Sequence, residues 1–310
     1  MVMARVVVTG ATGTIGTAVC QLLQARGDEP VALSRGTSAA TQRLPAGVAC
    51  HAWPRPTLEP APVEALAGCD AVIHLMGEPV AQRWTAAAKQ RIRASRVRST
   101  QMLVAALEQV PERQRPAVLI SQSATGYYGP RGSEELDESA GPGSDFLANV
   151  VSAWEQAAMA AASLCRVAVT RTGVVLSPGA GALAKMLPFF RAGIGGPVAG
   201  GRQYVPWVHI DDVAAAMLHC LEDGDAHGPL NLTAPSPVTN AELARALGRA
   251  LHRPAVLPVP SAALRLLYGE MAAIVTTGQR AVPKRLEQLG FSFRHDEIEP
   301  ALRDVLGSGT

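Results

Sequence analysis

The sequence has few aromatic residues, almost no excess of charge and no long hydrophobic run. Phe, Trp and Tyr make up 4% of the 310 residues, and the formal net charge is +2. Because no basic stripe is present, neither nucleic acid nor an acidic membrane is expected as a partner. No segment offers about 20 continuous apolar residues, so no membrane span is expected. Residues 1–9 are interpreted as a strand rather than a signal peptide, because no small-residue cleavage region follows them.

Cysteine and histidine are also sparse, and neither shows the spacing of a metal site. The chain has five cysteines and seven histidines, without a C-x-x-C pair. We therefore predict no metal site and no disulfide framework. This usage of cysteine fits a reducing compartment and predicts a cytoplasmic protein. The cysteines are Cys20, Cys50, Cys69, Cys165 and Cys220.

A glycine-rich junction near the start of the chain is the most informative motif. The apolar run from Val6 stops at Gly10, and a helical pattern begins shortly after Gly13. Gly10 would allow the tight turn, Gly13 the approach of phosphates, and Gly16 the close packing of helix on strand. The helix N-terminus would direct free N–H groups at a diphosphate. The junction predicts a dinucleotide site formed by Gly10, Thr12, Gly13, Thr14, Ile15 and Gly16.

Alternating strand and helix patterns follow this junction. They predict an α/β fold, a Rossmann-type doubly wound parallel sheet, with a smaller and mostly helical C-terminal substrate lobe. The Rossmann domain is expected over residues 1–175, with 207–235 returning to it, and the smaller lobe over 176–206 and 236–310. Strands are predicted at 4–9, 30–34, 71–76, 117–121, 166–171 and 229–232, and helices at 14–26, 86–109, 147–164, 211–222 and 239–251.

The end of the second predicted strand indicates which nicotinamide cofactor is preferred. An acidic residue at this place binds the ribose hydroxyls of NAD, but here Ser34 and Arg35 occupy it. The guanidinium of Arg35 can pair with a 2′-phosphate, so NADP(H) is predicted in preference to NAD(H). The alternative is a solvated loop arginine. The end of the third strand, at Leu75, Met76, Gly77 and Glu78, is expected to lie beside the cofactor.

Later motifs, read with the first, resemble the extended short-chain dehydrogenase/reductases. Ser121 to Gly129 (SQSATGYYG) resembles the strand end with their catalytic Ser, and Trp207 to Ala214 (WVHIDDVA) resembles their late His-x-Asp-Asp segment. A closer resemblance is to the atypical epimerase-family branch, often labelled "cell division inhibitor". Its motifs are matched by Gly77-Glu78-Pro79, Arg83-Trp84-Thr85, Arg171 to Leu176 and Asn231 to Pro235. The resemblance implies cofactor contacts by Ser121, Arg171 and Gly173.

The catalytic pair of the classical members is missing from this chain. Their Tyr and Lys lie as Y-x-x-x-K on one helical face, where the Tyr acts as acid/base. Leu147 and Val151 stand at those places here, and neither can transfer a proton. Ser123, Tyr127 and Lys89 are the candidate catalytic residues instead. The alternatives are a strand-end serine bonded to backbone, a packed tyrosine and a solvated lysine.

A second set of residues is placed on the substrate side of the cleft. Arg202 and Trp207 would suit an anionic or aromatic group, and the alternative is that Trp207 packs in the core. His209 is interpreted as a residue that orders its turn rather than as a base. The complete predicted substrate side is Arg83, Tyr128, Lys185, Arg202 and Trp207.

Two functions follow from these patterns. The first is an NADP-dependent oxidoreductase or epimerase-like enzyme, acting on a small carbonyl or sugar-like substrate without the usual Tyr and Lys. The second is a catalytically inactive NADP(H)-binding sensor or regulatory protein. The resemblance implies a monomer or a homodimer.

Overall fold

The structure is a computed structural model that describes residues 3–307. Its centre is a seven-stranded sheet in which all neighbours are parallel, in the order β11-β7-β5-β4-β1-β2-β3. The predicted Rossmann-type fold is therefore confirmed. Chain order reverses between β1 and β4, which opens a crevice at their carboxyl ends. The strands are β1 (Arg5–Thr9), β2 (Glu29–Ser34), β3 (Ala49–Ala52), β4 (Ala71–His74), β5 (Val118–Ala124), β7 (Arg166–Thr172) and β11 (Gly228–Leu232).

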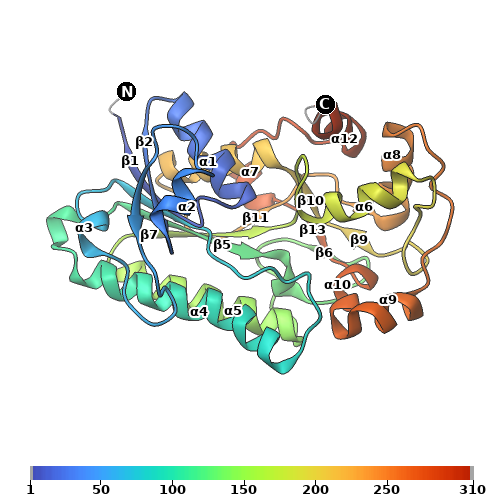
Figure 1. Cartoon of the computed structure of the whole chain (residues 1–310), viewed down its shortest axis with the longest axis horizontal. Helices are drawn as coiled ribbons and strands as arrows, with labels where there is room; N and C mark the ends of the chain where they lie inside the picture. The colour runs from blue at the N-terminus through green and yellow to red at the C-terminus, as the bar shows by residue number, and fades with distance from the viewer. Residues whose placement is uncertain (1–2, 308–310) are drawn as a thin grey trace.

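Helices cover both faces of the sheet (Figure 1). α1 (Thr14–Ala25) and α7 (Ile210–Glu222) pack against each other on one face. α4 (Ala86–Gln109) and α5 (Phe146–Met159) pack together on the other face, beside the short α3 (Val63–Leu66). No helix within residues 3–307 is both long enough and apolar enough to cross a membrane.

Alternate side chains of β1 enter two separate hydrophobic cores. Val6 and Val8 pack in the core beneath α1 and α7, whereas Val7 packs in the core beneath α4. All three side chains are fully buried. A strand buried on both faces needs apolar residues at successive positions, which explains the continuous run in the sequence.

Two strands differ from the sequence prediction. β3 was not predicted, because Ala49-Cys50-His51-Ala52 is short and only half-buried at the edge of the sheet. β5 continues to Ala124, three residues beyond the predicted end at 121. This extension pairs Ser123 with Arg171 on β7, so both residues lie at the carboxyl edge of the sheet.

A smaller lobe lies beside this edge (Figure 1). Its core joins Leu187 and Phe190 to Leu243 and Leu302, which come from widely separated segments. The domain boundaries given above remain a prediction. The remaining elements of the chain are β8 (Val174–Leu176), α6 (Gly181–Arg191), β9 (Tyr204–Val205), β10 (Trp207–His209), β12 (Val238–Thr239), α8 (Asn240–Ala250), α9 (Ser261–Tyr268), α10 (Ala273–Thr276), β13 (Arg280–Ala281), α11 (Lys284–Gln288) and α12 (Ile298–Gly307). β6 (Glu135–Leu136) pairs with β13, α2 (Thr37–Thr41) follows β2, and Leu286 of α11 packs in the core of the central sheet.

A buried histidine joins β4 to its neighbours. The Thr100 hydroxyl donates its proton to the Arg96 carbonyl, so it can only accept from the His74 ring, which assigns the imidazole proton to Nε2. The Thr9 hydroxyl accepts the amide N–H of Leu75 and has its own proton left for the other ring nitrogen. His74 then accepts at Nδ1 from Thr9, at 2.7 Å, and donates at Nε2 to Thr100, at 3.0 Å. Complete burial lowers the pKa of His74 from 6.5 to about 4.

We expect His74 to make the protein less stable in mild acid. Between pH 6.5 and about 4 the unfolded chain binds a proton that the folded chain does not. The free energy of unfolding should therefore fall by about 3 kcal/mol across that window as the pH decreases, and level off below it. Urea unfolding of the wild type and His74→Gln at several pH values measures this effect. An equal pH dependence in both proteins would contradict the assignment.

Candidate active site

A cavity of about 610 Å³ opens at the carboxyl ends of β4 and β5. One wall follows these strand ends, from Leu75 to Glu78 and from Gln122 to Gly126. The opposite walls come from α5 and from the smaller lobe. Chief among the lining residues are Ser123, Leu147, Val151, Trp154, Gly173, Tyr204 and the segment from Ala273 to Gln279.

The glycine turn lies directly beside this cavity. Gly10 has a φ of +67°, and a Cβ there would stand 2.8 Å from the carbonyl oxygen of Leu75. A Cβ on Gly16 would stand 2.4 Å from the carbonyl oxygen of Gly10, so only glycine permits this packing of helix on turn. Gly13 is the N-cap of α1 and makes no side-chain cap. The first N–H groups of α1 therefore lie available for an anion.

Ser123 faces the cavity and is bonded to a buried ion pair behind it. Its hydroxyl donates to Glu155 Oε1 at 2.6 Å. Glu155 is held by Arg171 through two parallel contacts of 2.9 Å, from Nε and from Nη2. Arg171 is 3% exposed and the side chain of Glu155 is 11% exposed. The arrangement keeps a carboxylate within hydrogen-bond reach of a hydroxyl that lines the cavity.

Arg171 also contacts both tyrosines of the loop after β5. Its Nη1 donates to the Tyr128 hydroxyl at 3.0 Å, and its guanidinium lies 3.5 Å from the ring centre of Tyr127. Tyr128 is fully buried and donates to Asn231, and burial raises the pKa of its hydroxyl to about 12. The substrate-side placement of Tyr128 is therefore wrong. Tyr127 stacks on Arg171 and does not belong to the cavity lining, so its predicted catalytic role gains no support from the geometry.

Arg171 was predicted to contact the cofactor. Its guanidinium is bonded to Glu155, Tyr128 and the Glu138 carbonyl, and it is absent from the cavity lining. The predicted cofactor contact of Arg171 stays a prediction. Gly173, two residues on, does line the cavity, and a Cβ there would stand 2.1 Å from the Pro206 carbonyl oxygen.

The absence of the usual catalytic pair has a visible consequence. Leu147 and Val151 lie on the face of α5 that lines the cavity, beside Gly126. The cavity wall is therefore apolar at the two positions where the sequence analysis predicts the loss of the tyrosine and lysine. Ser123 supplies a hydroxyl of the cavity lining that has a charged partner.

Two further groups of this wall were missed by the sequence analysis. Arg96 donates to the Glu78 carbonyl at 2.9 Å and lies over the ring of Trp154, and burial lowers its pKa to about 10. The indole N–H of Trp154 is buried and has no acceptor among residues 3–307. A buried unsatisfied donor in a residue that lines a cavity indicates a ligand or an ordered water. Glu155, the one charged residue of α5, was not among the predicted site residues either.

The remaining predicted residues lie outside the cavity lining. Trp207 is fully buried and donates to the Ser236 carbonyl, so its substrate-side placement is wrong. Lys89 is paired with Glu270, and Lys185 donates to the Ala81 carbonyl. The roles of these two lysines remain predictions. The side chains of Arg35, Arg83 and Arg202 are exposed, and their predicted roles remain predictions. The same holds for Ser34 at the end of β2 and Ser121 within β5.

A doubly wound parallel sheet with a glycine turn at its switch point defines the class of dinucleotide-binding Rossmann proteins. More narrowly, the chain belongs to the NAD dependent epimerase/dehydratase family, which matches residues 6–232. Residues 259–305 match a domain of unknown function, DUF1731. These matches confirm the resemblance to an atypical extended short-chain dehydrogenase/reductase with an added C-terminal domain.

Relatives of similar length carry the same family name. The chain is 38% identical over 307 residues to the human epimerase family protein SDR39U1, covering 97% of this chain and 99% of that one. It is 39% identical over 301 residues to the chloroplastic SDR39U1 homologue of Arabidopsis thaliana, covering 96% and 86%. A crystal structure of the human protein (isoform 2) with NADPH has a TM-score of 0.88 and 37% identity, covering 98% of this chain and 99% of that one.

Proposed function

We propose that the protein binds NADP(H) at the glycine turn and oxidises or reduces a small hydroxyl or carbonyl substrate in the adjoining cavity. One observation carries this proposal. The Gly10 turn packs on Leu75, and Leu75 lines the cavity that also contains Ser123. A diphosphate site and a reactive hydroxyl are thus neighbours. The similar human structure that contains NADPH supports the choice of cofactor.

The residues of this chain fit such a cofactor. A Cβ at Gly10 or Gly16 would collide with backbone atoms of Leu75, Gly10 or Ala11, so glycine is needed for the shape of this turn, and the N-terminus of α1 makes no side-chain cap. Thr12, Gly13, Thr14 and Ile15 would hold the diphosphate, and Ser34 with Arg35 the 2′-phosphate. When bound, the nicotinamide supplies or accepts a hydride.

Ser123 and Glu155 supply the proton transfer in this proposal. In alcohol oxidation, the substrate hydroxyl gives its proton to Ser123 Oγ as Ser123 gives its own to Glu155. The hydride leaves the carbon that bears the hydroxyl. Arg171 holds the Glu155 carboxyl group in place behind Ser123 through two hydrogen bonds. The proposed substrate is a small carbonyl or sugar-like molecule.

The test is turnover with the intact chain. The protein is incubated with NADP⁺ and a panel of secondary alcohols and sugars, or with NADPH and a panel of carbonyls, and the absorbance of the reduced nicotinamide is followed. Turnover on any member that is lost in Ser123→Ala supports the proposal. Tight cofactor binding without turnover across both panels contradicts it.

A second candidate is an inactive NADP(H)-binding sensor. The observation that favours it is the apolar wall at Leu147 and Val151, where the related enzymes carry their acid/base pair. A sensor needs cofactor binding but not the Ser123–Glu155 contact. Unchanged NADPH affinity and no measurable turnover in the wild type, Ser123→Ala and Glu155→Gln would support this candidate.

Arg35 is expected to determine the preference for NADP(H). Arg35→Ala should weaken NADPH binding by about 10–100-fold and leave NADH binding nearly unchanged, since only the former carries the 2′-phosphate. Fluorescence titration with both nucleotides measures the two affinities. Arg43→Ala, another exposed arginine outside the crevice, is the matched control. An equal loss for both nucleotides would contradict the assignment.

Other features of the function stay proposals of the same kind. The partner is a small-molecule substrate, and neither nucleic acid nor a membrane is expected from the balanced charge. A cytoplasmic location is proposed from the cysteine usage, and a monomer or homodimer from the family resemblance.

A further inference from the structure

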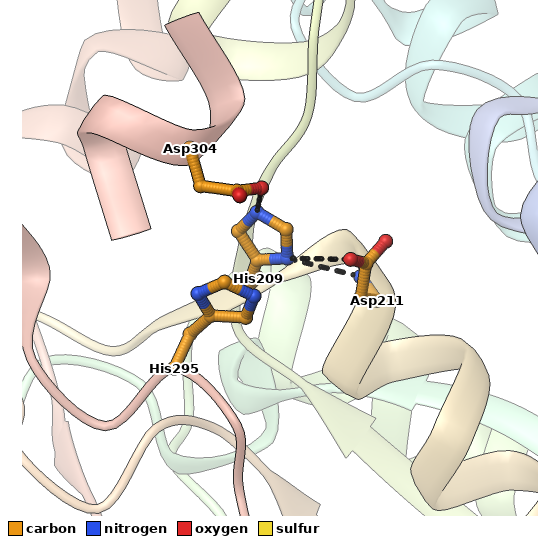
Figure 2. Close-up of side chains that lie close together, drawn as sticks. All are labelled: His209, Asp211, His295 and Asp304. Carbon is orange, nitrogen blue, oxygen red and sulfur yellow. Dashed lines mark hydrogen bonds and ion pairs between the residues drawn. The ribbon is translucent and has the colours of Figure 1, made fainter. Parts of the chain in front are cut away.

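Two histidines and two aspartates meet at a place outside the cavity lining. His209 ends β10, and Asp211 lies in the first turn of α7. His295 lies in the loop that precedes α12, and Asp304 lies on α12. Each residue offers a ligand atom within 4.8 Å of the others. Figure 2 shows the four side chains gathered around His209.

The four side chains together offer imidazole and carboxylate atoms at metal-ligand spacing. His209 Nε2 stands 3.3 Å from Asp304 Oδ2, and His209 Nδ1 stands 3.8 Å from Asp211 Oδ2. The two imidazole rings are stacked, with centres 3.7 Å apart. His209 is 1% exposed and His295 is 8% exposed, and Nε2 of each lacks a hydrogen-bond partner within residues 3–307. His209 Nε2 thus has only the ion-pair contact with Asp304, and a buried His295 nitrogen without a hydrogen bond beside two carboxylates requires an explanation.

The charges around the cluster favour a cation. The carboxylates of Asp211 and Asp304 supply negative charge. Asp212 does not compete, because its two oxygens accept the amides of Arg294 and His295 and so hold the His295 loop against α7. The guanidinium of Arg294 lies 3.9 Å from Asp211 and is mostly exposed.

We propose that His209, His295 and Asp304 bind a divalent transition-metal ion of the Zn²⁺ type, with Asp211 orienting His209. Donors of a tetrahedral zinc site stand about 3.4 Å apart, which is close to the separation of His209 Nε2 and Asp304 Oδ2. Mixed imidazole and carboxylate donors suit zinc better than magnesium or calcium, which prefer oxygen. The stacked His295 ring must turn to complete the site.

Asp211 has a different role from the three proposed ligands, because it orients the His209 ring. The amide of Asp211 donates to His209 Nδ1 at 3.2 Å, which leaves Nε2 directed toward Asp304. Metal binding at Nε2 requires the tautomer with the proton on Nδ1. Nδ1 would then give up its hydrogen bond from the Asp211 amide and donate instead to the Asp211 carboxylate, whose Oδ2 stands 3.8 Å away. The bound ion would join the start of α7, which packs on the Rossmann sheet, to α12 at the end of the described chain.

The test is Zn²⁺ binding by the full chain after treatment with EDTA. Isothermal titration should show one saturable site, and His295→Gln and Asp304→Asn should each weaken it at least about 100-fold. Asp211→Asn should weaken it by about 10–100-fold, as expected for an orienting residue. His219→Gln is the matched control, because His219 pairs with Asp223 on the same helix at 3.6 Å. No saturable site, or an equal loss in His219→Gln, would overturn the proposal.

A second measurement needs no variant. Co²⁺ replaces Zn²⁺ in such sites and absorbs visible light strongly when its coordination is tetrahedral. Wild-type protein titrated with Co²⁺ should develop this absorption and lose it when Zn²⁺ is added. The weak spectrum of hydrated Co²⁺ at all ratios would overturn the proposal, even if every ligand variant failed to fold.

Discussion

Replacing Arg171 with methionine is expected to lower the free energy of unfolding by about 3–5 kcal/mol, because the substitution leaves the Glu155 carboxylate buried without its cation. Arg171 is 3% exposed, and it also donates to Tyr128 and to the Glu138 carbonyl. The loss therefore includes a hydrogen-bond network as well as an ion pair. Urea unfolding followed by circular dichroism measures the change.

The double variant Glu155→Leu with Arg171→Met separates the charge from the packing. When both charged partners are removed, no carboxylate remains uncompensated, so the double variant should be more stable than Arg171→Met alone. Arg249, whose mostly exposed side chain pairs with Glu299, provides the control, and Arg249→Met should change stability by less than about 1 kcal/mol. A similarly small effect of Arg171→Met would show that the buried pair contributes little.

Ser123→Ala is expected to reduce kcat by about 10²–10⁴-fold without changing the affinity for NADPH, because it removes the hydroxyl between substrate and Glu155. Glu155→Gln should reduce kcat similarly, since an amide accepts no proton. Steady-state kinetics on the substrate found in the panel, with NADPH titration in parallel, gives both quantities. The test depends on the proposed enzymatic function.

A control variant and a measurement of folding separate a loss of catalysis in Ser123→Ala from a loss of structure. Ser163 is exposed on the short turn after α5, and Ser163→Ala should retain wild-type kinetics. Circular dichroism of Ser123→Ala establishes that the variant is folded. If folded Ser123→Ala retained wild-type kcat, the proton would have to reach the substrate by another residue.

Much of the fold could be predicted because its signals are local. The β-branched residues, glycines and helical spacing between Val6 and Ala25 predict the strand, turn and helix that the structure has there. The six predicted strands and the five main helices occur close to the expected bounds. β3 was not predicted because a short, half-buried edge strand has no apolar run in the sequence. Its extended conformation depends on pairing with β2.

The candidate site likewise has features that short segments of sequence determine and others that depend on contacts between distant residues. The glycine turn and the loss of the Tyr and Lys at Leu147 and Val151 are properties of short segments, so the sequence alone determined them. The sequence also predicted Ser123 as a site residue, but not its partner Glu155, which lies 32 residues away. Tyr128 was misplaced because its position in a motif does not indicate which way a buried side chain points.

For this protein, the sequence by itself determined the doubly wound sheet, the dinucleotide turn and the missing acid/base pair. Only the tertiary structure decided that Ser123 shares its proton with an ion pair, that Trp207 belongs to the core, and that His209 meets His295 and Asp304. The physical reason is the range of the interactions. Backbone geometry follows from neighbours along the chain, whereas pairing and burial of polar side chains depend on segments brought together by folding.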